Sequence, residues 1–212
     1  MNNHTVRSTV AGPAGLLACA VDTPLGASRG VAVLCHPHPQ HGGTMDNKVV
    51  LTLARAMVQL GYTAVRFNFR GVGGSEGSWD HGQGEVQDAL AVIAAHQGAH
   101  QGAGQALVLG GFSFGGYVAS QAATQLPAAA RAQRLVLVGP AVVNFAMAPV
   151  PEDTLVVHGE RDDVVPLAAV FDWARPQALP VTVLPGAGHF FHGQLTVLKH
   201  IVLRAFGSHT HP

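Results

Sequence analysis

The sequence has few cysteines, few charges and no long apolar run, and each shortage excludes a class of protein. Its two cysteines, Cys19 and Cys35, are too few for a disulfide framework, and both fall in apolar segments where small buried thiols are expected. Charged residues make up 11% of the chain and the formal net charge is zero, so no nucleic-acid or membrane-surface footprint is visible. The chain also lacks a bilayer-spanning run and a signal peptide. These absences predict a cytoplasmic globular protein.

The sequence does contain a regular alternation of strand-like and helix-like segments. Residues 5–22 are typical of an antiparallel hairpin, and the later strands are short apolar runs of the kind buried on both faces of a parallel sheet. The expected strands cover residues 30–35, 62–69, 107–110, 134–138, 154–158 and 181–184, and the expected helices cover residues 48–60, 84–96, 117–126, 167–175 and 194–206. This order predicts an α/β fold with a mostly parallel central sheet, helices on both faces and no cap domain.

The domain organisation follows from the same alternation. We predict a single domain over residues 1–207, because no internal repeat or domain linker interrupts the pattern. A short glycine and alanine linker is expected at residues 98–104, and residues 208–212 are expected to form a disordered tail.

Residues 107–118, LVLGGFSFGGYV, place a serine between a predicted strand and a predicted helix. The segment matches the G-x-S-x-G nucleophile elbow, with Ser113 at the apex of a very tight turn. Such a turn leaves no room for side chains at Gly111 and Gly115, and we expect Gly116 to let the helix pack close to the sheet. The Ser113 hydroxyl would then lie at a helix N-terminus that favours developing negative charge. In a chain with 26 glycines, the alternative is a capping serine at a glycine-rich helix start.

Nucleophilic serine catalysis also needs a base that takes the hydroxyl proton and an acid that orients this base. In a parallel sheet these groups come from loops at the carboxyl ends of the strands, because those loops share one edge. Ser113, Asp162 and His189 each follow a predicted strand. Their order along the chain, serine then aspartate then histidine, is that of the α/β-hydrolase triad.

Segments along nearly the whole chain resemble one known superfamily. They are HPHPQHGGTMDNKVV, RFNFRGVGGSEG, GFSFGG, HGERDDVVP and GAGHFFHG. The chain is similar to the α/β-hydrolase superfamily, and within it to small lidless bacterial proteins described as carboxylesterase-like or dienelactone-hydrolase-like. The first segment is the more specific to the bacterial group. Dienelactone hydrolases carry a cysteine at the elbow where this chain has Ser113, so the resemblance does not extend to dienelactone as a substrate.

The resemblance selects one residue among several candidates for the acid and for the base. The family pattern G-x-x-D-x-x-V-P selects Asp162 over its neighbour Asp163, which we expect to cap or begin the next helix. Glu160 lies too early in the same loop. The pattern G-x-G-H-x-F selects His189 over His192, which we expect to line the site or to cap the last helix.

The resemblance also implies an oxyanion hole made of two backbone N–H groups. One would belong to Phe114, directly after the nucleophile, and the other to His38, two residues after the strand-ending His36; Gln40 is the alternative for the second. The residues expected to line the substrate site are His36, Gln40, Phe112, Phe190 and His192, and further candidates for apolar walls are Trp79, Phe114 and Phe191.

The 13 histidines invite a metal-binding interpretation that their spacing does not favour. His36, His38 and His41 lie near Asp46, yet no H-E-x-x-H helix or cysteine pair accompanies them. The glycines of residues 71–77 match neither a Walker A loop nor G-x-G-x-x-G. We therefore expect no metal and no cofactor.

The resemblance implies a serine carboxylesterase that forms an acyl-serine on a small-molecule ester. Without a cap the site is expected to be open, which favours short acyl chains or bulky, partly exposed substrates. Three alternatives stay open: a thioesterase or peptidase with the same triad, a non-catalytic binding or signalling protein on a hydrolase fold, and an oligomer-forming scaffold. No nucleic acid or membrane partner is expected, and a homodimer stays open.

Overall fold

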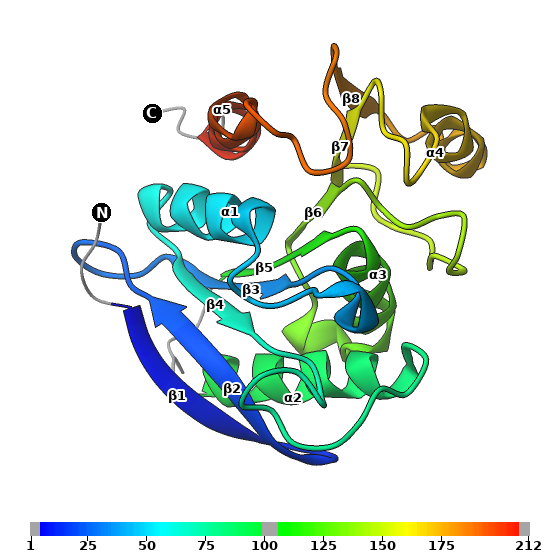
Figure 1. Cartoon of the computed structure of the whole chain (residues 1–212). Helices are drawn as coiled ribbons and strands as arrows, with labels where there is room; N and C mark the ends of the chain where they lie inside the picture. Colours follow the sequence, from blue (N-terminus) through cyan, green and yellow to red (C-terminus); the bar gives the residue numbers. More distant parts are fainter. Residues whose placement is uncertain (1–4, 99–105, 208–212) are drawn as a thin grey trace.

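The molecule is built on one eight-stranded sheet, which the computed structural model describes within residues 5–98 and 106–207 (Figure 1). The strands lie in the order β1-β2-β4-β3-β5-β6-β7-β8. Their bounds are β1 (Thr5–Gly12), β2 (Gly15–Asp22), β3 (Gly30–Cys35), β4 (Thr63–Phe67), β5 (Ala106–Phe112), β6 (Arg134–Val138), β7 (Leu155–Gly159) and β8 (Val181–Leu184). The pairs β1–β2 and β2–β4 are antiparallel and the others are parallel. The predicted sheet and its N-terminal hairpin are therefore confirmed.

Helices cover both faces of this sheet, as predicted. Helices α1 (Lys48–Gln59) and α5 (Leu195–Gly207) lie on one face, and α2 (Gln83–Gly98) and α3 (Phe114–Gln125) lie on the other (Figure 1). Helix α4 (Leu167–Ala174) packs beside β7. Short 3-10 helices cover Pro39–His41, Ala128–Ala130 and Arg175–Gln177. The described part of the chain contains no inserted cap, so the sheet edge that carries the site is not covered by a separate layer.

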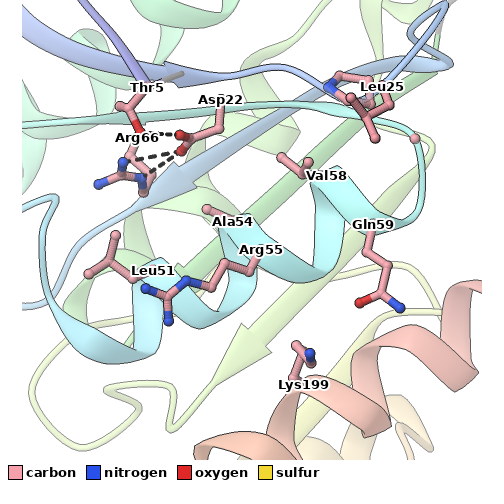
Figure 2. Close-up of a pocket in the computed structure, with 12 residues that line it drawn as sticks. Thr5, Asp22, Leu25, Leu51, Ala54, Arg55, Val58, Gln59, Arg66 and Lys199 are labelled. Carbon is pink, nitrogen blue, oxygen red and sulfur yellow. Dashed lines mark hydrogen bonds and ion pairs between the residues drawn. The ribbon is translucent and has the colours of Figure 1, made fainter. Parts of the chain in front are cut away.

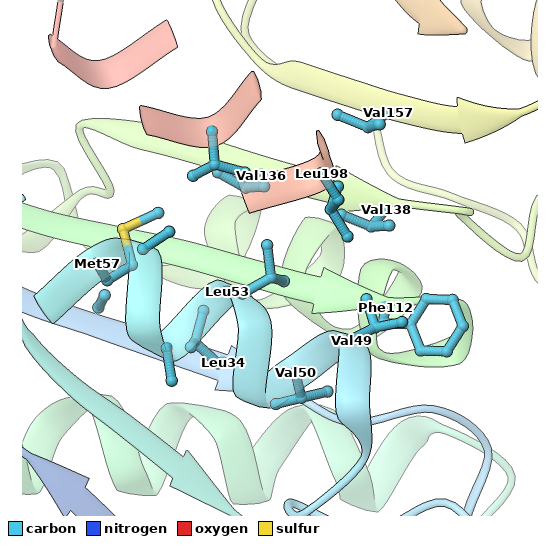
Figure 3. Packing of buried hydrophobic residues seen from close by; sticks show 14 of the residues in the cluster. Leu34, Val49, Val50, Leu53, Met57, Phe112, Val136, Val138, Val157 and Leu198 are labelled. Carbon is cyan, nitrogen blue, oxygen red and sulfur yellow. The ribbon is translucent and has the colours of Figure 1, made fainter. Parts of the chain in front are cut away.

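The core on the α1 face shows how the sequence pattern becomes packing. Asn47 caps α1, because its side-chain oxygen accepts a hydrogen bond from the backbone N–H of Val49 at 2.9 Å. Val49, Leu53 and the residues that continue this stripe point at the sheet and at Leu198 of α5 (Figure 3). Burial of each such side chain stabilises the fold by roughly 1.5–3 kcal/mol. This packing holds the strand ends, and hence the loops that follow them, in fixed positions.

The loop between β4 and α2 is anchored, although its glycines suggest a flexible turn. Arg70 donates to the buried carboxylate of Asp88 on α2, from Nη2 to Oδ1 at 2.7 Å and from its backbone N–H to Oδ2 at 3.0 Å. A Cβ at Gly84 would lie 2.1 Å from the Arg70 guanidinium, so only glycine leaves room for this pair. Removing one partner of a buried, hydrogen-bonded pair typically costs about 3–5 kcal/mol.

The remaining expectations about the chain concern its cysteines, membrane-spanning helices, and the linker and tail predicted from the sequence. Cys19 and Cys35 are free and buried, as predicted, and burial raises the pKa of the Cys19 thiol to about 11 and that of Cys35 further. Within the described residues no helix is long and apolar enough to cross a bilayer. Residues 99–105 and 208–212 lie outside the described residues, so the expected linker and disordered tail stay predictions.

Candidate active site

Ser113 alone forms the turn between β5 and α3. Its backbone has φ 55° and ψ −118°, in a region that residues other than glycine rarely occupy. Such a conformation costs about 1–3 kcal/mol and persists only where the surroundings enforce it. The Ser113 side chain makes no capping hydrogen bond to α3. The structure therefore presents a strained serine at the turn and not a capping serine.

The three glycines around Ser113 differ in how much space each would leave for a side chain. A Cβ at Gly111 would lie 2.0 Å from the carbonyl oxygen of Gly115, and one at Gly115 would lie 2.2 Å from that of Cys35. Both predictions of a cramped turn are confirmed. The prediction for Gly116 is wrong, because its Cβ would meet Pro140 only at 3.6 Å, an ordinary van der Waals contact. The close approach of helix to sheet occurs one residue earlier, at Gly115.

Asp162 and His189 form a buried hydrogen-bonded pair. His189 Nδ1 donates to Asp162 Oδ2 at 2.7 Å, and Asp162 Oδ1 accepts from the backbone N–H groups of Val164 at 2.9 Å and Val165 at 2.7 Å. Burial raises the pKa of the Asp162 carboxyl, but the bonds from His189 and Val165 outweigh it, so that the pKa is lower than usual. The carboxylate is therefore ionised at neutral pH, and it holds the proton of His189 on Nδ1.

The His189 ring lies over the end of β6, beside the serine turn. The backbone N–H of Ser113 donates to Val138 O at 2.9 Å, which joins the turn to the end of β6. A Cβ at the next residue, Gly139, would lie 3.4 Å from His189 Cε1. The ring of Phe112, the residue before the serine, lies 4.9 Å from the His189 ring between centroids. The structure thus brings the three predicted residues to one place at the sheet edge.

A second buried histidine next to this pair was missed by the sequence analysis. His158 Nε2 donates to Val165 O at 2.9 Å and lies 3.5 Å from Asp162 Oδ2. Its Nδ1 is buried without a hydrogen-bond partner among the described residues. Burial lowers the pKa of His158. Its position at a strand end, just before the acidic loop, is the only sequence signal that could have identified it.

The alternative candidates for the acid, Asp163 and Glu160, and for the base, His192, lie outside the Asp162–His189 pair. Asp163 is exposed, and α4 has Pro166 at its N-cap and no acidic residue in its first turn, so the expected helix-capping role is wrong. Glu160 accepts a hydrogen bond from the backbone N–H of Gly186 at 2.7 Å and ties two loops together. His192 is exposed at the surface.

The loop after β3 presents one of the two expected backbone donors. The N–H of Gln40 donates to His38 Nδ1 at 3.2 Å and is therefore occupied. Within the described residues, the N–H groups of His38 and Phe114 donate no hydrogen bond. The carbonyl of His38 accepts from His41 at 3.1 Å and Gly43 at 3.0 Å, which closes the loop into a tight turn. This geometry favours His38 over Gln40 as the second donor.

The same loop is held by Arg66 of β4 and by Asn68, the residue after β4, neither of which the sequence analysis singled out. Asn68 Oδ1 accepts from the backbone N–H of Met45 at 2.8 Å, and Arg66 Nη1 donates to Met45 O at 3.0 Å. Arg66 also pairs with Asp46 at 2.7 Å and with Asp22 at 3.1 Å. The buried guanidinium therefore fixes the end of the loop against the sheet.

His36 supports this loop from beneath. Its ring is fully buried, Nδ1 donates to Pro37 O at 2.6 Å, and Nε2 accepts from the backbone N–H of Phe69 at 3.1 Å. Burial lowers the pKa of His36 to about 4, so the ring is neutral at pH 7. Among the predicted lining residues, His36 and Phe112 are buried and do not line an open surface, whereas Gln40, Phe190 and His192 are exposed.

The proposed site coincides neither with a metal-binding cluster among the described residues nor with a groove beside α1. Within residues 5–98 and 106–207, no group of three or more His, Cys, Asp or Glu side chains could hold a metal ion. A groove of about 870 Å³ lies between the N-terminal hairpin and α1, with Arg55 and Lys199 at its wall (Figure 2). None of Ser113, Asp162 and His189 lines it.

The fold and the arrangement at the sheet edge are those of an α/β hydrolase, and comparison with known proteins identifies the family. A family model described as serine aminopeptidase, S33, matches residues 26–152. A lidless α/β serine hydrolase from Xanthomonas campestris is 36% identical, with a TM-score of 0.86 over 100% of this chain and 99% of that chain. An α/β serine hydrolase homologue from Coxiella burnetii is 39% identical, with a TM-score of 0.81 over 96% and 97% of the two chains. The chain belongs to the α/β serine hydrolase superfamily, among its lidless bacterial members.

Three further proteins are similar to this chain, one of them above 30% identity. The uncharacterized protein RP471 of Rickettsia prowazekii is 35% identical over 174 residues, covering 76% of this chain and 71% of that protein. The esterase Pf2001 of Pyrococcus furiosus, at 16% identity, covers 97% of this chain and 92% of its own with a TM-score of 0.76. Est1E of Butyrivibrio proteoclasticus with bound ferulic acid, at 15% identity, covers 95% and 98% with a TM-score of 0.78. At these identities the two esterases share the fold alone.

Proposed function

We propose that this protein hydrolyses carboxylic esters, with Ser113 as nucleophile, His189 as general base and Asp162 as the acid that orients His189. One observation carries the proposal: a buried hydrogen bond of 2.7 Å between His189 Nδ1 and Asp162 Oδ2, beside a serine held at φ 55°. A strained backbone at a strand-to-helix turn has no structural benefit of its own, whereas in a nucleophile elbow it orients the serine hydroxyl for attack.

In the first half of the proposed reaction, His189 takes the proton of Ser113. Because Nδ1 donates to Asp162, Nε2 carries the lone pair and accepts the hydroxyl proton while Oγ attacks the ester carbonyl. The imidazolium that forms is stabilised by the Asp162 carboxylate, which stays ionised because its pKa is lowered mainly by the bond from His189. The product of this step is a tetrahedral intermediate bound to Ser113.

The negative charge of that intermediate would be held by the N–H groups of Phe114 and His38. Phe114 begins α3, so the helix N-terminus adds its partial positive charge at the same point. Removing one such donor typically costs about 3–4 kcal/mol of transition-state stabilisation. Both donors are backbone groups, so their loss cannot be produced by shortening a side chain.

The second half of the reaction reverses the roles of His189. Its Nε2 gives the proton to the leaving alcohol oxygen as the carbon–oxygen bond breaks, which leaves an acyl-Ser113. A water then attacks the acyl carbonyl while Nε2 takes its proton. When the bond to Oγ breaks, the carboxylic acid leaves and Ser113 regains the proton.

Thioesters and peptides are the alternative substrates, because the same three groups cleave them by the same steps. The description of the matching family model names a serine aminopeptidase, which keeps peptides among the substrates to be tested. The two esterases of the same fold make esters the first substrates to test. A binding protein without turnover is the alternative from another class.

The test compares 4-nitrophenyl esters of increasing acyl length with wild type, Ser113→Ala and Ser78→Ala. Ser78 is an exposed serine and serves as the matched control. We expect turnover by wild type and Ser78→Ala, with a loss of at least about a thousandfold in Ser113→Ala. Covalent labelling of Ser113 by a fluorophosphonate, together with turnover of thioesters or peptides only, would reject the ester preference and keep the mechanism. Absence of both turnover and labelling would reject the mechanism in favour of a binding protein.

A further inference from the structure

A group of aromatic rings lies beside the two proposed oxyanion donors. We call His38, Trp79 and Phe145 the aromatic shelf, because their rings are partly exposed and rest on the fully buried ring of Phe114. The ring centroids of Phe114 lie 5.2 Å from His38, 5.2 Å from Trp79 and 4.9 Å from Phe145. His38 and Trp79 are 4.6 Å apart. These separations are those of mutually packed aromatic rings.

The sheet order places His38 and Trp79 on the side of Ser113 away from His189. Ser113 follows β5; His38 follows β3 and Trp79 lies in the connection after β4, on one side of β5 (Figure 1). His189 follows β8 and packs over the end of β6, on the other side. The proposed nucleophile therefore lies between the general base and the His38 and Trp79 rings of the aromatic shelf, whereas Phe145 reaches the shelf from the connection after β6.

We propose that the acyl side of this site recognises an aromatic ring, so that the preferred substrates are esters of aryl carboxylic acids. The proposal rests on the esterase function proposed above. The alcohol oxygen must face His189 to receive its proton, and the acyl group then extends toward the opposite side, where the aromatic shelf lies. With the carbonyl oxygen at the N–H groups of His38 and Phe114, an aryl group attached to the carbonyl carbon comes within stacking range of the shelf.

The aromatic shelf is held in place before any ligand binds. The loop that carries Trp79 is tied to α2, because the buried carboxylate of Glu85 accepts from the backbone N–H groups of Asp80 at 3.0 Å and Gly82 at 2.8 Å. The His38 ring accepts from the N–H two residues later at 3.2 Å. A preformed surface loses little conformational entropy on binding, which makes an aromatic contact more effective.

The charge state of the shelf suits an uncharged ring. Burial lowers the pKa of His38, and the neighbouring His41, stacked on it at 4.4 Å, lowers it further. The His38 imidazole is therefore neutral at pH 7 and presents an apolar face. The Trp79 and Phe145 rings beside it are also uncharged, so the shelf has no cation to attract a charged acyl group.

The experiment compares kcat/KM for 4-nitrophenyl benzoate and 4-nitrophenyl cyclohexanecarboxylate, which share a leaving group and a ring size. We expect Trp79→Leu to lower the benzoate-to-cyclohexanecarboxylate ratio about 3- to 10-fold, the effect of losing one aromatic pair. Trp79→Phe keeps a ring and should hold the ratio within about twofold. Phe171→Leu removes an exposed ring of α4 outside the shelf and is expected to leave both substrates unchanged.

The two proposals fail in distinguishable ways. Hydrolysis of both esters with an unchanged ratio in Trp79→Leu would overturn the aromatic subsite and leave the esterase standing. The second readout does not need turnover: the chain has two tryptophans, so Trp173→Phe leaves Trp79 as the only one. In that variant, also carrying Ser113→Ala, benzoate should quench Trp79 fluorescence saturably and cyclohexanecarboxylate should not. Absence of quenching by benzoate would overturn the subsite, even if Trp79→Leu failed to fold.

Discussion

His158 Nε2 lies 3.5 Å from Asp162 Oδ2, the same oxygen that accepts the hydrogen bond from His189 Nδ1 at 2.7 Å. His158 Nε2 donates to Val165 O, so its proton is on that nitrogen and the ring is neutral. Protonation of Nδ1 would bury an N–H group without an acceptor among the described residues. Because His158 stays neutral, the charge of Asp162 is left to stabilise His189.

His158 is expected to act as a positioning residue for Asp162. His158→Leu leaves Val165 O without its donor, which should cost about 1–3 kcal/mol of stability in urea unfolding. A shift of the acidic loop by about 1 Å should lower kcat/KM by up to about 100-fold. His158→Gln, whose amide can reach the same carbonyl, should recover most of both losses. Full activity in a folded His158→Leu protein would show that Val164 and Val165 alone hold Asp162.

The adjacent aspartates are expected to respond very differently to the same change. Asp162→Asn should lower kcat by about 10³–10⁴, because an amide no longer favours the tautomer of His189 that can act as a base. Asp163→Asn is the matched control, since Asp163 is exposed and, within the described structure, its carboxylate makes no hydrogen bond to His189 or Ser113. The measurement is the initial rate of ester hydrolysis. A larger loss of activity in Asp163→Asn than in Asp162→Asn would show that Asp163, and not Asp162, is the acid.

Two neighbouring glycines of α3 give a test of the turn itself. Gly115→Ala should prevent folding or cost more than about 3 kcal/mol, because its Cβ would lie 2.2 Å from Cys35 O, a backbone atom that cannot move cheaply. Gly116→Ala should stabilise the protein by about 0.5–1 kcal/mol, since its Cβ has room and alanine is the better helix former. Thermal unfolding of the two variants measures the difference. Equal effects would contradict the close approach at Gly115.

His36 is expected to make the fold sensitive to mild acid. Its pKa is lowered to about 4 in the folded state by burial, while the unfolded chain has the ordinary value of about 6.5. Between these values the unfolded state binds the additional proton, so stability falls as the pH drops from 7 toward 4. For this one group the loss between pH 7 and pH 5 is about 2 kcal/mol.

The measurement is urea unfolding of wild type and His36→Phe at both pH values. The variant should be less stable at pH 7, because Phe69 N–H loses its acceptor, yet it should lose about 2 kcal/mol less on acidification. An identical acid loss in the two proteins would mean that His36 is not the titrating group.

Local patterns were enough to predict most of the fold. The apolar runs and glycine punctuation placed the strands and helices within three residues of their observed ends, as for α1 at Lys48–Gln59 and β8 at Val181–Leu184. The tight turn at Ser113 was predictable because G-x-S-x-G specifies a backbone that only glycines at positions 111 and 115 permit. These features depend on residues close together in the chain.

The tertiary structure decided what depends on packing between distant segments. The residues lining the substrate site were predicted from their positions in the sequence alone. The His36 ring is buried against Phe69, so His36 does not line an open surface. The occupied N–H of Gln40 depends on how the His38 ring turns. The Phe145 ring packs in the aromatic shelf, although Phe145, His38 and Trp79 lie in three different loops.

The sequence by itself determined the order of the elements, the strained turn and the residue types available at the sheet edge. It could not determine that His158 and His189 would meet one carboxylate, nor that rings from three loops would gather beside Ser113. Those relationships follow from the strand order, which sets loops far apart in the chain side by side. Periodicity reports only which way a residue faces, whereas its partner is chosen by long-range packing.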